Sequence, residues 1–170
     1  MKVTIVEYSA AWRELFEQEK RLLESAIGES PAVIEHVGST SVIGLAAKPI
    51  IDIMIGLRDF SVANNLVSKI EAVGYEYVPE YEDVMPYRRY FKKRVAGIKT
   101  HHIHMVKLGG EFWQRHLLFR DFLRANPDVA DEYGALKKGL AELDWDDTNR
   151  YVDAKTDFIK NIENKARERS

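Results

Sequence analysis

The chain has 170 residues, of which 45% are hydrophobic, so it is long enough to form one buried core. We expect a single domain, with a core over residues 1–110 and helices over residues 111–170 packed on it. The 25 basic residues balance 27 acidic ones, which argues against bulk binding to nucleic acid or to an anionic membrane. There is no cysteine, which excludes disulfides and thiolate zinc sites. Neither a signal pattern nor an apolar run of bilayer length is present, so we expect a cytoplasmic protein.

The first part of the chain predicts a strand, a helix and a second strand. Residues 3–6 are a short apolar run typical of a strand, and Ser9 can cap a helix over residues 10–27 that Gly28 closes. Apolar residues recur along this helix at helical spacing, so we expect it to pack on the core. Residues 32–37 are again apolar and stop at a Gly-Ser-Thr-Ser cluster, as strands do where a loop begins.

The turn after this strand is a candidate phosphate site. Gly38 lets the backbone approach a ligand closely, and Ser39, with Thr40 beside it, offers a hydroxyl and backbone N–H groups to a phosphate. A simple Ser/Thr turn is the alternative. Lys48, which precedes Pro49, could neutralise a phosphate or pair with a carboxylate, and an ordinary surface lysine is the alternative.

Residues 50–57 predict a strand with one acid on an otherwise apolar element. Ile51 and Ile53 point to one face, whereas Asp52 and Met54 point to the other. A carboxylate in this position is costly to bury alone, so Asp52 needs a metal, a cation or hydrogen-bond donors facing it.

The rest of the chain predicts one helix, three strands and three helices. The helix starts at Asp59 or Ser61 and stops at Gly74, and the last two strands form an antiparallel hairpin, which makes the sheet mixed. We expect Trp145 to pack against the core. The expected strands cover 75–78, 87–95 and 100–108, and the expected helices cover 111–125, 127–143 and 147–166.

The strand over 87–95 mixes basic and aromatic side chains, which can hold phosphates and stack a base. Alternation puts Arg89 and Phe91 on one face, and Arg88 and Tyr90 on the other. We take Arg89 as the nucleotide-binding candidate. An edge strand kept soluble by its charges is an equally good interpretation.

Histidines on the next strand are candidate ligands. His102 and His104 share a face, and two imidazoles two residues apart on a strand can bind one metal ion or one anion. His36 would complete a group of three histidines with Asp52, a set that suits Mn²⁺, Zn²⁺ or Fe²⁺ better than Mg²⁺. The alternative is that these histidines hydrogen-bond the backbone or Asp52 without a metal.

The C-terminal helices offer further candidates for the wall of a cleft. Arg120 and Arg124 lie one helical turn apart, as do Tyr151 and Lys155. Interhelical salt bridges explain the arginines nearly as well.

The Gly-Ser turn followed by an Asp on an apolar strand resembles the core motif of the polymerase-beta-like nucleotidyltransferases. Longer motifs resemble the GrpB family of small bacterial proteins, namely Glu35-His36-Val37-Gly38-Ser39-Thr40-Ser41-Val42, Ala47-Lys48-Pro49-Ile50-Ile51-Asp52-Ile53, Arg89-Tyr90-Phe91 and His102-Ile103-His104. The resemblance implies an α/β (α+β) fold: a mixed sheet flanked by helices, with a C-terminal three-helix segment. It also implies phosphate at the Gly-Ser turn and Mg²⁺ or Mn²⁺ on the strand acid. Met54 stands where such transferases usually carry a second Asp.

We therefore expect a cleft that binds a nucleotide or another phosphorylated small molecule with a divalent metal. Asp52 would ligate the metal, Ser39 and Lys48 would contact phosphate, and His102 and His104 would be ligands or a proton shuttle. If the protein is catalytic, it would transfer a nucleotidyl group. The alternatives are a non-catalytic ligand- or metal-binding module and a protein-interaction domain.

Overall fold

The computed structural model describes residues 3–30, 32–143 and 148–169. In this part of the chain, one five-stranded sheet has the strand order β1-β2-β5-β4-β3. Strands β2 and β5 pair in parallel and the other neighbours pair antiparallel, so the expected mixed sheet is confirmed. The strands are β1 (Ala32–Val37), β2 (Ile51–Leu57), β3 (Glu76–Val78), β4 (Arg88–Val95) and β5 (Ile98–Lys107).

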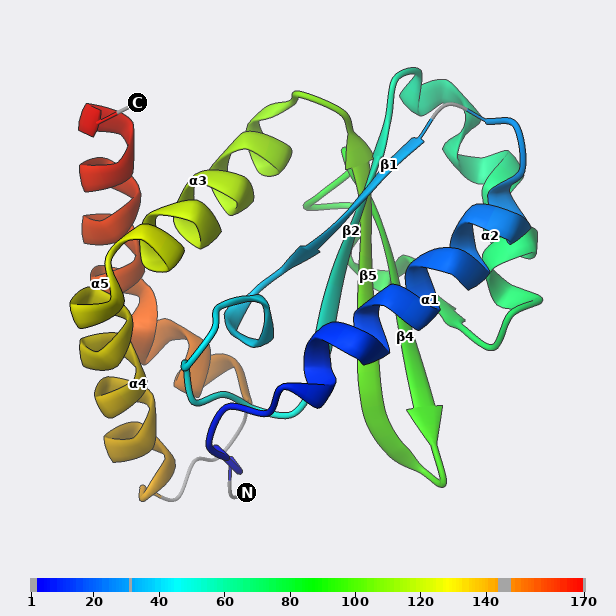
Figure 1. Cartoon of the computed structure of the whole chain (residues 1–170). Helices are drawn as coiled ribbons and strands as arrows, with labels where there is room; N and C mark the ends of the chain where they lie inside the picture. The colour runs from blue at the N-terminus through cyan, green and yellow to red at the C-terminus, as the bar shows by residue number, and fades with distance from the viewer. Residues whose placement is uncertain (1–2, 31, 144–147, 170) are drawn as a thin grey trace.

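Helices lie on both sides of the sheet (Figure 1). The first pair, α1 (Ala11–Ile27) and α2 (Ala63–Glu71), lies on one side, and α3 (Glu111–Ala125), α4 (Pro127–Ala141) and α5 (Thr148–Arg169) gather on the other. Short 3₁₀ turns precede or follow strands at Ser39–Ser41, Phe60–Val62 and Pro79–Tyr81. Among the described residues, no helix is long and apolar enough to cross a membrane.

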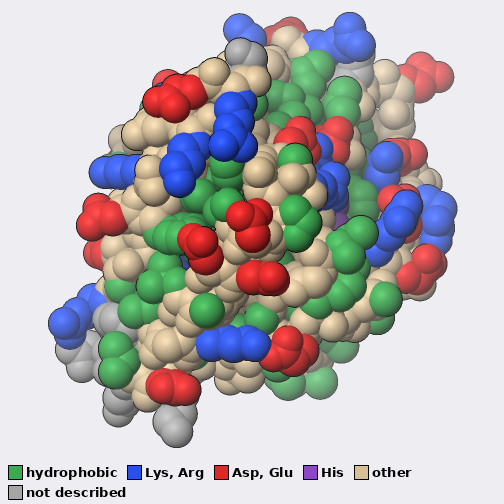
Figure 2. Space-filling view, turned by 60° about the vertical axis from the view of Figure 1, so that its left-hand side comes forward, with side chains coloured by type: hydrophobic (Ala, Val, Ile, Leu, Met, Phe, Trp, Pro, Cys, Tyr) green, Lys and Arg blue, Asp and Glu red, His purple; other side chains and the backbone are tan. Residues whose placement is uncertain are grey.

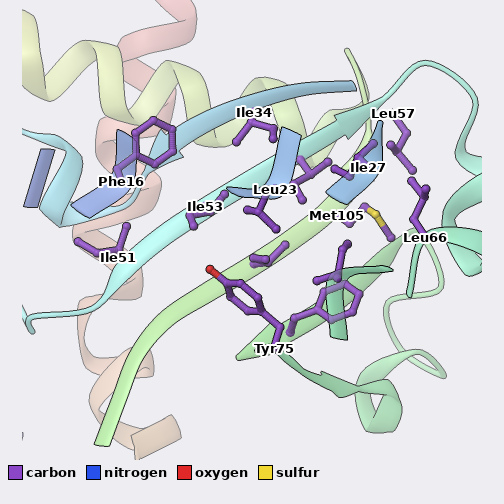
Figure 3. Packing of buried hydrophobic residues seen from close by; sticks show 14 of the residues in the cluster. Phe16, Leu23, Ile27, Ile34, Ile51, Ile53, Leu57, Leu66, Tyr75 and Met105 are labelled. Carbon is purple, nitrogen blue, oxygen red and sulfur yellow. The ribbon is translucent and has the colours of Figure 1, made fainter. Parts of the chain in front are cut away.

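The main core lies between the sheet and the first two helices. Alternation along β2 turns Ile51, Ile53, Ile55 and Leu57 to this side, where each is at most 1% exposed. Figure 3 shows Phe16, Leu23 and Ile27 of α1 packed over them. Each fully buried side chain of this size contributes about 1.5–3 kcal/mol, so this face holds β2 firmly and leaves its other face free for chemistry.

The C-terminal helices form a second apolar cluster that reaches back to the loop after the Gly-Ser turn. Val42 and Leu45 from that loop pack with Phe122 of α3, Tyr133 of α4 and Ile162 of α5. The loop that carries the candidate phosphate site is thereby fixed against all three helices. Whether both parts fold as one domain stays a prediction.

One expected strand is not formed, and one expected contact lies outside the described residues. The strand expected over 3–6 is wrong, because Val6 forms a single bridge with Ala47, with N···O distances of 2.9 and 3.0 Å. The pairing does not continue, since the chain next reaches Pro49, which has no N–H to donate. The expected packing of Trp145 falls outside the described residues.

Candidate functional site

Asp52 lies on the sheet face that the main core leaves free. The register pairs Asp52 with His102 and Met54 with His104 across the two parallel strands. His102 Nδ1 and His104 Nε2 lie 3.4 and 3.7 Å from the same Asp52 oxygen, Oδ1. The structure thus brings together the acid and these two imidazoles, as the strand arrangement of the resembling superfamily implied.

The Gly-Ser turn touches the Asp52 carboxylate directly. Gly38 has a φ of 73°, and a Cβ added there would lie 2.5 Å from Asp52 Oδ2. A side chain at this position would therefore meet both a strained backbone and a steric clash. A group bound by the turn would lie next to the acid.

The charges in this group follow from burial and from the contacts between its members. Burial by itself raises the pKa of Asp52, but the contacts with His102 and His104 bring that pKa below its ordinary value. Burial lowers the pKa of His104, and Asp52 offsets this only in part. Arg88 Nη1 donates to His104 Nδ1 at 3.2 Å, so the ring proton of His104 is on Nε2, facing Asp52. At neutral pH the group is an anionic Asp52 beside a neutral His104.

Three lysines converge on a pocket of about 180 Å³ beside Asp52 and Ser39. Lys48 comes from the loop before β2, Lys137 from α4 and Lys155 from α5. The amines of Lys48 and Lys155 lie 4.7 and 4.8 Å from the centre of the Tyr151 ring. Lys48, Tyr151 and Lys155, which were expected at a phosphate site and in the wall of a cleft, thus line one pocket with Ser39, and their binding of phosphate stays a prediction.

Burial lowers the pKa of all three amines, and repulsion from neighbouring lysines adds to this effect. Lys137 is 2% exposed, and its Nζ has no hydrogen-bond partner among the described residues. Burial, followed by repulsion from Lys155 and Lys48, lowers the pKa of Lys137 to about 7. Burial, followed by repulsion from Lys48, lowers the pKa of Lys155 to about 8. The pocket therefore carries more positive charge than its own residues neutralise, which is the condition for binding an anion.

Lys137 is absent from the sequence-based candidates. It lies on the buried face of α4, which also contains Ala130, Tyr133 and Gly134. These four positions have the i, i+3, i+4, i+7 spacing of a core-facing stripe, so a lysine at the last position was the signal that could have identified it.

His36 is wrongly expected to join the Asp52 group. It pairs with Ile53 on β2, so its side chain lies on the core face, stacked on Phe16 at 4.8 Å. Thr40 Oγ1 donates to Ile50 O at 3.1 Å and therefore accepts from His36 Nε2 at 2.9 Å. Both side chains have structural partners, although Thr40 also lines the lysine pocket.

The choice of Arg89 over Arg88 is also wrong. Arg89 lies on the α2 side of the sheet, where its Nε donates to Asn64 Oδ1 at 2.9 Å and lies 3.5 Å from a Glu82 oxygen. Arg88 pairs with Val106, which puts it on the Asp52 face.

Arg120 and Arg124 do not line the pocket that contains Asp52. Arg120 binds Glu35 at 2.7 Å, Asp121 at 2.9 Å and the carbonyl of His36 at 3.0 Å. Arg124 Nε donates to the carbonyl of Ser41 at 2.9 Å. Both line a separate hollow of about 670 Å³ between α1, β1 and α3. The bonds of both arginines are to protein groups, so the salt-bridge alternative describes Arg120.

The residues present do not form a complete metal site by themselves. In the described part of the chain, no group of three or more His, Cys, Asp or Glu side chains is arranged to hold a metal ion. Met54 is fully buried with Val37, Val106 and Trp113, so hydrocarbon fills the place of a second acid. Asp52 remains as a partly exposed carboxylate that could ligate a cation together with oxygens of a ligand.

The outer surface around this region carries charges of both signs. Figure 2 shows acidic and basic side chains intermixed over the face that contains the C-terminal helices. The outer face of these helices therefore has no broad basic patch.

Comparison with known proteins identifies close relatives over the full length of the chain. Residues 2–165 match the model of the family described as GrpB protein. The chain is 39% identical to the glutamate-rich protein GrpB of Alkalihalophilus pseudofirmus, over 96% of this chain and 95% of that one. It is 42% identical to the UPF0157 protein YqkA of Bacillus subtilis and spans about half of that longer protein, 48%.

Solved structures extend the comparison to the fold. The crystal structure of the conserved protein GrpB from Enterococcus faecalis superposes with a TM-score of 0.88 at 39% identity, covering 98% of both chains. A structure of the Cid1 poly(U) polymerase with Mg 3′-dATP bound gives a TM-score of 0.54 at 14% identity, over 81% of this chain and 43% of that one. The second likeness shows that the two proteins share the nucleotidyltransferase fold.

Proposed function

This chain belongs to the GrpB protein family, and because its own nucleotidyltransferase-like fold surrounds a lysine pocket, we propose that it binds a nucleotide or another phosphorylated small molecule by its phosphates. The observation that carries this proposal is Lys137. It is a buried amine without a hydrogen-bond partner among the described residues, aimed into a pocket that also contains Lys48 and Lys155.

A phosphate chain matches the charge of this pocket. Lys48, Lys137 and Lys155 form no ion pair within the described part of the chain, so a polyanion would supply the missing negative charge. Binding would restore the proton affinity that the amines lose by burial and mutual repulsion. Ser39, at the edge of the same pocket, adds a hydroxyl for a phosphate oxygen.

The size of the pocket limits what it can hold. A volume of about 180 Å³ accommodates phosphate groups and not a whole nucleotide. The nucleoside would extend from the pocket onto the open sheet face, past Asp52.

We propose Mg²⁺ or Mn²⁺ as the divalent ion, with Asp52 as its protein ligand and phosphate oxygens of the bound molecule as the others. Such an ion, when bound, supplies charge neutralisation at the phosphate. Asp52 suits this role because it is ionised at neutral pH and lies against the Gly-Ser turn.

If the protein is catalytic, the reaction would be nucleotidyl transfer. An acceptor hydroxyl would attack the α-phosphorus, the bond to the bridging oxygen would break, and pyrophosphate would leave toward the lysines. The acceptor proton would pass to His102. His104 is the poorer base, since Arg88 and Asp52 engage both of its nitrogens, whereas His102 is engaged by Asp52 through Nδ1 alone. His102 Nε2 is buried without a hydrogen-bond partner among the described residues, so the ring would have to turn toward the acceptor.

One observation favours binding without turnover. Met54 packs in an apolar cluster with Trp113, so the second acid of the superfamily is replaced by a closed core contact. A non-catalytic module would bind the same phosphates and release them unchanged.

Isothermal titration with nucleoside triphosphates and with inorganic triphosphate, each with and without Mn²⁺, tests the binding proposal. We expect Lys155→Met to weaken binding at least tenfold, because it removes a cation from the pocket. Lys160→Met, an exposed lysine on the same helix, is the matched control and should bind as the wild type. Absence of heat with every one of these ligands would remove the proposal. Transfer of labelled nucleotide to candidate acceptors then separates the enzyme from the module.

A further inference from the structure

Arg88 is a second buried cation on the Asp52 face, on the opposite side of the histidines from the lysine pocket. It pairs with Val106 at the start of β4, and the next residue on the same face, Tyr90, pairs with His104. The Arg88 side chain is therefore directed to the same surface as Asp52, and the residue is only 9% exposed.

The contacts of Arg88 are unusual for a buried arginine. Its guanidinium donates a hydrogen bond to His104 Nδ1, and it lies 4.8 Å from the Tyr90 ring centre and 6.0 Å from that of Tyr81. In the described part of the chain it forms no ion pair. Arg120, which is similarly buried, has two carboxylates, from Glu35 and Asp121. Arg88 thus retains N–H groups and a positive charge that no carboxylate of the described residues neutralises.

Exposed aromatic surface surrounds this cation. Tyr81 and Tyr87 are 50% and 51% exposed. Tyr87 and Phe112, whose ring centres are 6.4 Å apart, line a hollow of about 330 Å³ together with Val106, the residue paired with Arg88. Lys107, Glu111 and Arg115 line the same hollow, and Arg88 lies next to it through its pairing with Val106. This volume accommodates a ring-sized apolar group.

We propose that Arg88 binds the carboxylate of a second small-molecule substrate, whose apolar or aromatic body lies against Tyr87 and Phe112. A guanidinium can hold a carboxylate with two parallel hydrogen bonds, and the surrounding rings strengthen the pair by excluding water.

Charge favours a carboxylate over a phosphate at this position. Arg88 supplies a single positive charge, whereas the lysine pocket gathers three amines. The next cation along this face of β4, Lys92, lies 3.5 Å from Glu76 and so is already paired. One free guanidinium matches a monoanion.

The link from Arg88 through His104 to Asp52 places this site next to the proposed reaction centre. Its role as the acceptor site rests on the proposed function. The binding of a carboxylate does not, since it needs neither the lysines nor a nucleotide.

The test uses the full chain and benzoate as the probe, with benzamide as its neutral counterpart and phenyl phosphate as the dianion. Titrations followed by ¹⁵N NMR should show the Arg88 side-chain N–H signals shifting with benzoate and not with benzamide. We expect Arg88→Gln to weaken benzoate binding at least tenfold. Arg88→Lys keeps the charge without the planar fork and should weaken it by several-fold.

Two variants serve as controls. Arg94 lies on the same strand as Arg88 but is exposed and does not line the hollow, so Arg94→Gln should leave benzoate binding unchanged. Lys137→Met should abolish triphosphate binding and leave benzoate binding intact, which separates failure of this site from failure of the nucleotide proposal. If Arg88→Gln does not fold, Arg88→Lys and the benzoate–benzamide comparison decide. Three results would overturn the proposal. The first is unchanged benzoate binding in Arg88→Lys together with equal binding of benzamide, and the second is loss of benzoate binding in Arg94→Gln or Lys137→Met. The third is tighter binding of phenyl phosphate than of benzoate in the Lys137→Met background.

Discussion

Replacing Lys137 by methionine should stabilise the protein at neutral pH while it removes anion binding. Burial lowers the pKa of Lys137 from 10.5 to about 7, and the residue is 2% exposed. This difference corresponds to a folding cost of about 5 kcal/mol, since each pKa unit is worth about 1.4 kcal/mol. The cost is absent above about pH 10.5, where the amine is neutral in both states. It grows as the pH falls and is complete below about pH 7.

Urea unfolding followed by tryptophan fluorescence measures the effect. We expect Lys137→Met to gain about 1–4 kcal/mol at pH 7, because replacing a buried charge by an apolar side chain of similar size gains this much in other proteins. Near pH 10 the wild type has lost most of its penalty, so the gain should nearly vanish there. Lys160→Met should change stability by less than about 0.5 kcal/mol at either pH. A destabilised Lys137→Met at pH 7, or an equal gain at both pH values, would refute the assignment of Lys137 as an unpaired buried amine.

Three further predictions concern the turn and its surroundings. Gly38→Ala should cost about 3 kcal/mol or more of unfolding free energy in urea, because its Cβ would lie 2.5 Å from an Asp52 oxygen. Gly28 has a similar φ of 70° but open space around it, so Gly28→Ala should cost only about 1–2 kcal/mol. Equal losses in the two variants would contradict the clash. Burial lowers the pKa of His36 from 6.5 to about 4, so its stability contribution is complete above pH 6.5 and is lost as the pH falls toward 4. Relative to His36→Gln, the wild type should therefore lose about 2 kcal/mol more between pH 7 and pH 5, and parallel pH profiles would count against a buried neutral imidazole. Arg120→Ala should destabilise by about 1–3 kcal/mol, because Arg120 loses its bonds to Glu35 and Asp121, which are themselves partly exposed. It should leave triphosphate affinity within about twofold, and a large loss of affinity would return Arg120 to the site.

Local periodicity predicted the five strands of the sheet and the helices, though it wrongly added a strand over residues 3–6, and it sorted the side chains of each strand into two sets. The alternation along β2 separated Asp52 from Ile51 and Ile53, and the same period put His102 and His104 on one face of β5. It could not decide which set of a neighbouring strand faces the same way, because that depends on register. This is why Arg89 was chosen over Arg88, and why His36, which pairs with Ile53, was wrongly grouped with Asp52.

The lysine pocket shows a different limit. Its amines come from residues 48, 137 and 155, which lie on a loop and two helices far apart in sequence. Only tertiary packing, through the cluster that joins Val42 and Leu45 to the C-terminal helices, brings them together. Helical spacing identified Tyr151 with Lys155 as one surface, but a lysine within an apolar stripe, such as Lys137, is usually assigned to solvent.

Gly56 determines how closely helix α3 approaches the Asp52 face of the sheet. Gly56 lies directly beneath the indole of Trp113, and a methyl group there would come within 2.6 Å of the ring. Helix α3 could not keep its place above a larger residue, and α3 also carries Phe112 and His116, whose rings lie 5.5 and 6.2 Å from that of His104. A single carbon atom added in β2 would therefore displace α3 away from the histidines. This makes Gly56 the simplest position at which the space over His104 could be widened to admit bulkier molecules.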